Sequence, residues 1–369
     1  MTPRLLIGLL VGAIPALFAT SASATLLFAG GEDIDFNCVS GGTCVVDTAT
    51  GRFRAEWARE AYRVDGITGD PAANRFATPA FTASTTLWVH ARYCNDNCGS
   101  NTTTANAQML RLLDNNGNPA LIVYGTGAAG TIKISSRASN GSLTDLVTCP
   151  GAIGRGLAQI DLYVNYAVSG ELAFYNNGVK VCDFTGNVTN GDGATTLSQA
   201  EFASASAYAS GSGHSSSWSE VIIATTDTRS MARYSALTVV DGSTTGFSGT
   251  NVCSSIWRAT AVNDANYGYS DADNVVHECA IAGTVPPGAY SVVGLVMSTR
   301  ALVGTTGPQH FDFVTRVGGT DYTSSDFAPL PAFSNIGNYI QSTNPATGSP
   351  WAVSDFAATG FNLGEMTKP

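Results

Sequence analysis

Closely spaced carboxylates near the start of the chain are the first residues whose types could do chemistry. In GEDIDFN, residues 31–37, Asp33 and Asp35 share one face of an extended strand, and Glu32 lies on the other. A retaining glycosidase needs two carboxyl groups about 5 Å apart and a further residue that orders them. Because Phe36 and Asn37 stand where another acid would be needed, we interpret this stretch as an acidic strand edge in solvent.

Other catalytic patterns are equally incomplete. Asp161 and Glu171 lie on neighbouring expected strands, where alternation more often sends such side chains into solvent. His214 lies in a serine-rich loop, and the sequence has no nucleophile elbow. The glycine-rich GTGAAG, residues 125–130, precedes an expected strand, whereas a dinucleotide fingerprint opens a helix. The sequence therefore predicts a protein that is not an enzyme.

Aromatic side chains in loops, beside Asn, Asp and Gly, could instead stack on sugar rings. Tyr267 and Tyr269 stand in NDANYGYSDAD, which has no apolar neighbours, so we expect both to be exposed. For the other aromatic residues, packing in the core is the competing interpretation. The candidate ligand-binding residues are Tyr93, Asn95, Asp96, Trp218, Tyr267 and Tyr269.

Calcium and zinc are the metals that the residue types suggest. Asp264, Asp271 and Asp273 could supply the hard oxygen ligands of calcium, but without the fixed spacing of an EF-hand loop, and a hydrated turn is the competing interpretation. Zinc has little support, because the chain has no CxxC pair and its four histidines are scattered. We expect no cofactor, and calcium stays open.

The chain has eight cysteines, an even number that favours disulfides and an oxidising compartment. Connectivity does not follow from the count alone, but two pairs flank loops short enough to close locally. The pairing that spacing favours is Cys38 with Cys44, Cys94 with Cys98, Cys149 with Cys182, and Cys253 with Cys279.

Beyond residue 25 the chain reads as all-β. Short apolar or β-branched runs alternate with clusters of Gly, Asn, Asp and Ser, without long helical periodicity. The best marked hairpin is residues 170–184, GELAFYNNGVKVCDF, which turns at Asn177 and Gly178 because a type I′ turn needs positive φ at both central residues. Alternation from that turn predicts one face with Leu172, Phe174, Val179 and Val181, and another with Ala173, Tyr175, Lys180 and Cys182.

Charge and the amino-terminal segment bear on partners and location. The formal net charge is −10 with only three lysines, so no basic stripe is evident and nucleic acid is not expected as a partner. Residues 1–24 resemble a secretory signal, with Arg4, an apolar run and small residues ending at Ala24. We expect export to the extracellular space or the cell surface.

The strand segments also carry a family resemblance. IDLYVNY, GELAFYNNG and SEVIIATTDTR, within residues 26–230, resemble the concanavalin-A-like, laminin-G-like jelly-roll superfamily, and more narrowly a group of phage and prophage virion proteins of tails, appendages and decorations. DADNVVHECAIAGTVPPGAYSVVGLVMSTRAL, RVGGTDYTSS and NPATGSPWAVSDFAATGFNLGE resemble the carboxy-terminal module of that group. The resemblance implies a jelly-roll sandwich over 25–230 and a second β-rich module with a short C-terminal segment over 231–369. It transfers no catalytic residues.

Together these features predict a non-enzymatic surface or virion-associated protein. We expect it to recognise a polysaccharide or host-surface glycan through loops at the rim of the sandwich, and so to mediate adhesion. We also expect association with itself or with other surface or virion subunits. A purely structural subunit of a capsid, tail or extracellular filament is the first alternative, and a glycoside hydrolase is the second.

Overall fold

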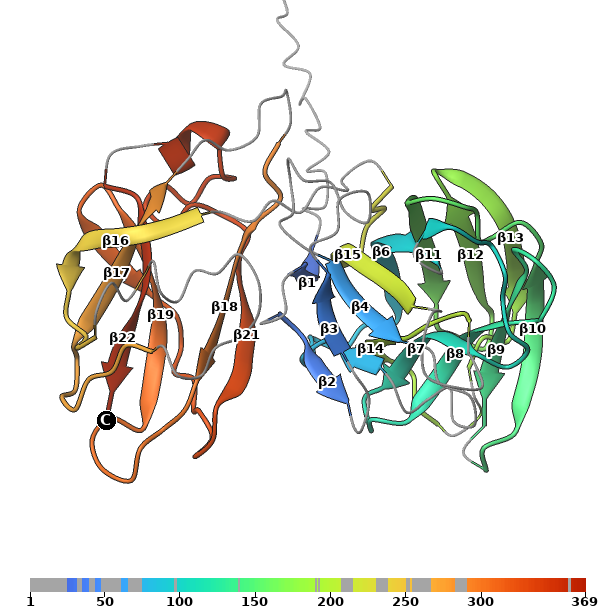
Figure 1. The fold of residues 1–369 in the computed structure, drawn as a ribbon, viewed down its shortest axis with the longest axis horizontal. Coiled ribbons are helices and arrows are strands. Elements are labelled where there is room, and N and C mark those ends of the chain that lie inside the picture. The colour runs from blue at the N-terminus through green and yellow to red at the C-terminus, as the bar shows by residue number, and fades with distance from the viewer. Residues whose placement is uncertain are drawn as a thin grey trace, which may run out of the picture.

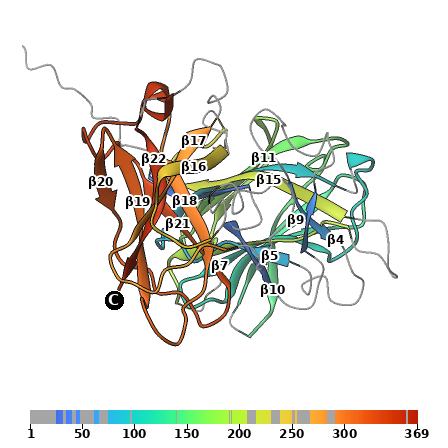
Figure 2. The same ribbon diagram turned by 60° about the vertical axis from the view of Figure 1, so that its left-hand side comes forward.

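The computed structural model describes residues 25–31, 35–39, 44–47, 61–65, 75–95, 98–138, 140–189, 191, 193–206, 215–229, 238–249, 253, 267–282, 291–357 and 360–369. These residues form two β modules that lie side by side in both ribbon views (Figure 1, Figure 2). Nearly all of the regular structure is antiparallel β-sheet, as the sequence predicts. Among the described helical segments, none is long and apolar enough to cross a membrane.

The amino-terminal module is a jelly-roll sandwich of two sheets (Figure 1). The order in the eight-stranded sheet is β13 (Val179–Gly186), β12 (Gly170–Asn176), β11 (Ala158–Asn165), β6 (Thr86–Cys94), β15 (Ser215–Ala224), β4 (Ala61–Asp65) and β3 (Cys44–Asp47), and β1 (Leu26–Gly30) also pairs with β15. The order in the seven-stranded sheet is β10 (Leu143–Cys149), β9 (Ile132–Arg137), β8 (Pro119–Gly125), β7 (Gln108–Asp114), β14 (Leu197–Phe202), β5 (Arg75–Ala77) and β2 (Asn37–Val39).

Period-two alternation builds the core between these sheets. Along β6, Leu87, Val89, Ala91 and Tyr93 are buried in the core cluster, while the intervening side chains point to the opposite face of the sheet. Trp218 on β15 packs into the same core. The sequence alternation is thus the physical origin of both the inner and the outer face of each sheet.

The hairpin of β12 and β13 turns as predicted, with φ of 50° at Asn177 and 78° at Gly178. The expected face of Cys182 is wrong. A register shift beyond Tyr175 makes Cys182 the partner of Phe174, so Cys182 joins the core instead of facing away from it. A bulge adds one residue to one strand and therefore moves every side chain beyond it to the other face.

Three disulfides follow the pairing that spacing favours: Cys94–Cys98, Cys149–Cys182 and Cys253–Cys279. Cys38 is also disulfide-bonded, and the side chain of Cys44 lies outside the described residues. The Cys149–Cys182 disulfide joins β10 to β13, each of which is an edge strand of its sheet, and so links the two sheets at that edge. The disulfides indicate an oxidising environment.

The carboxy-terminal module has its own core. Its five-stranded sheet is ordered β16 (Thr238–Thr245), β17 (Val276–Ala282), β22 (Asn362–Lys368), β19 (His310–Val317) and β20 (Thr320–Thr323), and β18 (Leu295–Ala301) pairs with β21 (Ser334–Gln341). A 3₁₀ turn, η3 (Val353–Ala357), precedes β22. The module buries Leu295, Met297, Phe311, Phe313, Trp351, Phe356 and Phe361 in one cluster.

Strand β21 also contacts the sandwich. The backbone N–H of Ala29 on β1 donates to Asn338 Oδ1 at 2.9 Å, and Asn335 Nδ2 donates to the carbonyl of Phe36. A cavity of about 330 Å³ lies beside this contact, lined by residues from 25–28, 79–82 and 337–342.

Candidate functional site

Three of the six candidate ligand-binding residues lie in the sandwich core, which corrects the expectation of an exposed rim platform. Tyr93 and Trp218 are partners on β6 and β15, and their rings pack 4.5 Å apart. The indole N–H of Trp218 donates to the carbonyl of Ala203 at 2.9 Å, and the Tyr93 hydroxyl donates to the buried Asn95 at 2.9 Å. Tyr93 continues the inward alternation of β6, so the signal for burial was present in the sequence.

Two acidic residues also differ from the expectation that they lie in solvent. Asp35 is buried and accepts a hydrogen bond from the backbone N–H of Gly31 at 2.9 Å. Asp161 is fully buried and lies 2.8 Å from His90 Nδ1. In both cases a buried carboxylate is retained by hydrogen bonds from neighbouring donors. Asp33, Asp96, His214 and Asp264 lie outside the described residues.

No close carboxylate pair is formed by Asp161 and Glu171. Asp161 lies opposite Tyr175, whereas Glu171 lies opposite Asn165, four residues along the strand. At about 3.4 Å per residue this offset is roughly 14 Å, beyond the separation that glycoside cleavage uses.

Two acids do meet in the carboxy-terminal module. Burial raises the pKa of Asp312, and a hydrogen bond with Asp326 raises it further, while Lys368 Nζ at 3.2 Å opposes the shift. Carboxyl groups in hydrogen-bond contact are closer together than the 5 Å or more that places them on either side of a glycosidic bond. Asp312 and Asp326 therefore do not have the separation of a glycosidase pair.

Tyr267 and Tyr269 are exposed, as their sequence context predicts. Their side chains are 54% and 51% accessible. The segment is extended, and Tyr269 forms a two-bond bridge with Ser248 at 2.8 and 3.0 Å. Because the tyrosines are two residues apart in an extended chain, they share a face, and their ring centroids lie 6.3 Å apart.

Phe333, just before β21, extends this pair into what we call the aromatic surface: Tyr267, Tyr269 and Phe333. The Phe333 ring centroid lies 5.7 Å from that of Tyr267. The guanidinium of Arg300 lies over Phe333 at 5.8 Å and donates to Asn335 Oδ1 at 3.0 Å. Phe333 was not among the sequence candidates, because 66 positions separate it from Tyr267 and only the fold brings them together.

Polar groups flank the aromatic surface along the chain. Asp271 and Asp273 are exposed in the turn that follows Tyr269 and leads into β17. A half-exposed set of rings with amide, guanidinium and carboxylate groups nearby can stack on one face of a pyranose and hydrogen-bond to its hydroxyls.

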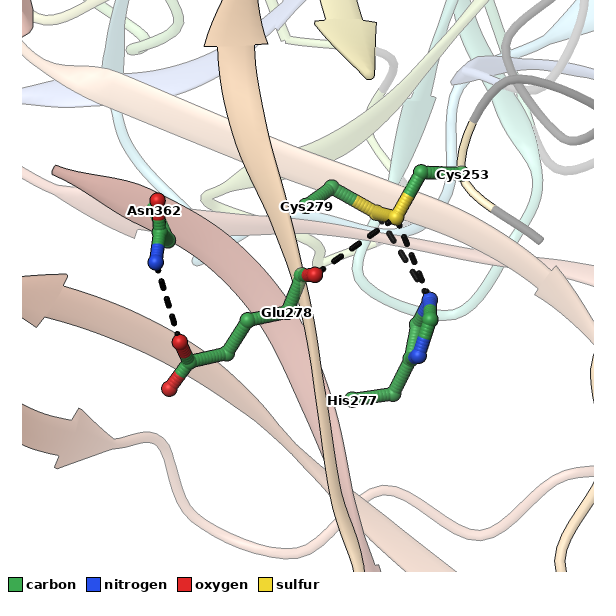
Figure 3. Close-up of a disulfide and its surroundings, with 5 residues drawn as sticks. All are labelled: Cys253, His277, Glu278, Cys279 and Asn362. Carbon is green, nitrogen blue, oxygen red and sulfur yellow. Dashed lines mark hydrogen bonds between the residues drawn. A yellow bond between two sulfur atoms is a disulfide. The ribbon is translucent and has the colours of Figure 1, made fainter. Parts of the chain in front are cut away.

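A different group carries the only metal-like arrangement among the residues that the structure describes. Cys253, His277 and Cys279 place their donor atoms within 4.8 Å of one another. The two sulfurs are joined in a disulfide, and His277 Nε2 lies 3.2 Å from Cys253 Sγ (Figure 3). Metals bind thiolates, so this oxidised arrangement is a structural crosslink against which the imidazole packs.

Comparisons with known proteins give a likeness of fold alone. No protein-family model matches the chain, and no curated protein matches it. The globular domain of T. cruzi calreticulin has a TM-score of 0.38 and 11% identity over 56% of this chain and 90% of its own. An endo-β-1,4-glucuronan lyase from the fungus Trichoderma reesei has a TM-score of 0.38 and 11% identity over 56% and 95%. A pentraxin from Limulus polyphemus has a TM-score of 0.31 and 17% identity over 45% and 76%. These likenesses assign neither an activity nor a ligand to this chain.

Proposed function

We propose that this protein is a non-catalytic glycan-binding protein that holds a sugar chain against the aromatic surface of its carboxy-terminal module. The observation that carries the proposal is the pair of half-exposed tyrosines, Tyr267 and Tyr269, beside Phe333. Exposed aromatic clusters on soluble proteins commonly mark interaction sites, because leaving such area in water is unfavourable.

The chemistry of the surface favours a sugar over an apolar partner. The tyrosines carry hydroxyls, and the guanidinium of Arg300 places a charged, polar group against the ring of Phe333. A pyranose has an apolar face of C–H groups and an equatorial edge of hydroxyls, so it matches rings with polar groups at their edge. The loop of Tyr267 and Tyr269 is the contact region that the sequence favoured, but it lies on the second module and not at the rim of the sandwich.

Substitution of both tyrosines tests the proposal. The double variant Tyr267→Ala, Tyr269→Ala should have at least tenfold lower affinity than the unsubstituted protein for the same glycan. The loss corresponds to about 1.5 kcal/mol of ring contact. Screening against an array of neutral and acidic glycans identifies the ligand, and titration calorimetry measures the affinity. Val179→Ala, which removes exposed apolar area from the sandwich hairpin, is the matched control. Unchanged binding by the tyrosine variant would refute the site.

The proposal extends to where the protein acts. An exported or virion-borne protein would use such a site for adhesion to polysaccharide or to host-surface glycans. We propose that binding needs no cofactor. Calcium at the turn of Asp271 and Asp273 is the alternative, and a repeat of the titration after dialysis against EDTA distinguishes the two.

A structural subunit remains the second candidate, and one observation favours it. Leu302 and Leu330 are 41% and 61% exposed, and a hydrogen bond from Val303 N to Leu330 O at 3.0 Å brings their segments together. Exposed leucines of this kind suit self-association. Sedimentation velocity on the native protein and on Leu330→Ser would show concentration-dependent assembly, lost in the variant, if this candidate holds.

A further inference from the structure

We propose a second binding site, on the outer face of the seven-stranded sheet, for a polysaccharide that carries carboxylate groups. Its binding residues are Arg111, Lys133 and Arg137, and Tyr124 helps to position Asp145 beside Lys133. The site lies on the other module from the aromatic surface and does not depend on the function proposed for that surface.

Strand register brings these residues to one face. Cross-strand partners share a face of a sheet. One row runs Glu201, Arg111, Ile122, Ser135 and Asp145 across β14, β7, β8, β9 and β10. The neighbouring row runs Gln108, Tyr124 and Lys133. Arg137 follows Ser135 by two residues on β9 and therefore has the same orientation.

Positive charge on this face exceeds negative charge. Arg75 and Arg111 share one carboxylate, with Arg75 Nε and Arg111 Nη1 at 2.8 and 3.4 Å from Glu201 Oε2. Lys133 Nζ lies 2.6 Å from Asp145 Oδ2. Arg137 has no carboxylate partner within the described parts of the chain. Among the residues that the structure describes, Arg75, Arg111, Lys133 and Arg137 thus share this face with the carboxylates of Glu201 and Asp145, in a chain whose formal net charge is −10.

The electrostatics of Arg111 agree with this count. Burial lowers the pKa of its guanidinium, and repulsion from Arg75 and Arg137 lowers it further against the opposing effect of Glu201. Arg75 and Arg137 are thus close enough to Arg111 to repel it, and an anion bound among these guanidinium groups would reduce that repulsion.

A hydrogen-bond network holds the second row in place. Asp145 Oδ1 accepts from the Tyr124 hydroxyl at 2.5 Å and from Ser135 Oγ at 2.7 Å. The hydrogen bond from Lys133, together with those from Tyr124 and Ser135, holds the pKa of Asp145 at about 2, so Asp145 stays ionised. Burial and Asp145 raise the pKa of Tyr124, which keeps its proton. Tyr124 thus donates its one proton to Asp145 and holds that carboxylate beside Lys133, which is a positioning role rather than proton abstraction.

The spacing and the donor types select the occupant. Neighbouring strands lie about 4.8 Å apart, close to the length of one sugar unit in an extended chain. A polysaccharide that crosses the strands would therefore meet a new strand with each sugar. Arginine forks pair with carboxylates through two parallel hydrogen bonds. Duplex DNA concentrates negative charge far more densely and would be repelled by the acidic remainder of the molecule.

Binding of polygalacturonate to the full-length protein tests the site. Titration calorimetry should show binding that weakens with added salt, and Arg137→Gln should weaken it about tenfold or more, the loss expected for a hydrogen bond to a charged group. Lys180→Gln is the matched control, because Lys180 is an exposed, ion-paired cation on the other sheet. Thermal unfolding checks that each variant is folded.

Each outcome bears on the site. Loss with Arg137→Gln and retention with Lys180→Gln support it. No binding to polygalacturonate overturns it, as does equal loss in both variants. Dextran sulfate or duplex DNA that binds more tightly than polygalacturonate overturns the carboxylate assignment. Tyr267→Ala, Tyr269→Ala should leave polygalacturonate binding intact, so failure of the aromatic surface is distinguished from failure of this site.

Discussion

His90 and Asp161 meet as a fully buried pair on the outer side of the eight-stranded sheet, with His90 Nδ1 2.8 Å from Asp161 Oδ1. The same carboxylate oxygen accepts from Thr228 Oγ1 at 2.9 Å. Next to Thr228, the guanidinium of Arg229 lies 4.3 Å from the Tyr175 ring and 5.1 Å from the Trp88 ring. The segment that leaves the sandwich is therefore attached to the sheet, and it covers Trp88 on the side away from the core.

Asp161→Ala should lower the free energy of unfolding of the sandwich by about 3 kcal/mol, because it leaves the buried His90 and Thr228 without this acceptor. Urea titration followed by tryptophan fluorescence measures the change. Asp183→Ala, which breaks the exposed Lys180 to Asp183 ion pair, should leave the free energy of unfolding nearly unchanged. Equal effects from the two substitutions would contradict the structural role of the buried pair.

The Cys149–Cys182 disulfide should contribute more to stability than Cys94–Cys98. It closes a loop with a sequence separation of 33, against 4 for the shorter disulfide. The chain-entropy relation gives about 3 to 4 kcal/mol for the longer loop. Denaturant unfolding of Cys149→Ser, Cys182→Ser against Cys94→Ser, Cys98→Ser would show the order, and a larger loss from the shorter disulfide would contradict it.

The lowered pKa of Asp145 should make the free energy of unfolding fall at low pH. Its folded pKa of about 2 lies below the ordinary 3.8, through hydrogen bonds from Lys133, Tyr124 and Ser135. A carboxylate with a lowered pKa contributes stability above pH 3.8, and that contribution is lost as pH falls through about 2. Asp145→Asn should therefore make the free energy of unfolding depend less on pH in this window. Between pH 6 and 7 the variant should be only modestly less stable, since Asp145 is half exposed. An unchanged profile between pH 4 and 2 would show that the network does not hold the proton off Asp145.

The mature amino terminus should begin at Thr25, as the signal-like leader predicts. Intact mass of protein from the native source, with and without reduction, reports both the cleavage and the closed disulfides. A start at Met1 or Thr2 with free thiols would point to assembly in a reducing cytoplasm instead.

Local patterns in the sequence were sufficient for the strands, the Asn177-Gly178 turn and the pairing of Cys149 with Cys182. Residue contacts that depend on register were not predictable in this way. The face of Cys182 depends on a bulge that alternation does not reveal. Arg111 meets Glu201 because β14 inserts between β5 and β7, although 90 positions separate the two residues. A chain without a basic stripe in its sequence can therefore assemble a basic face from single residues on separate strands.

The contact between the modules has a mechanical consequence. Two asparagines of β21 hold the carboxy-terminal module to the sandwich. Asn335 donates to the backbone carbonyl of Phe36, and Asn338 accepts from the backbone N–H of Ala29. A pull on the carboxy-terminal module would load these two hydrogen bonds before it reached either hydrophobic core. The junction would then yield first, and both folded modules would survive on a chain that has become longer.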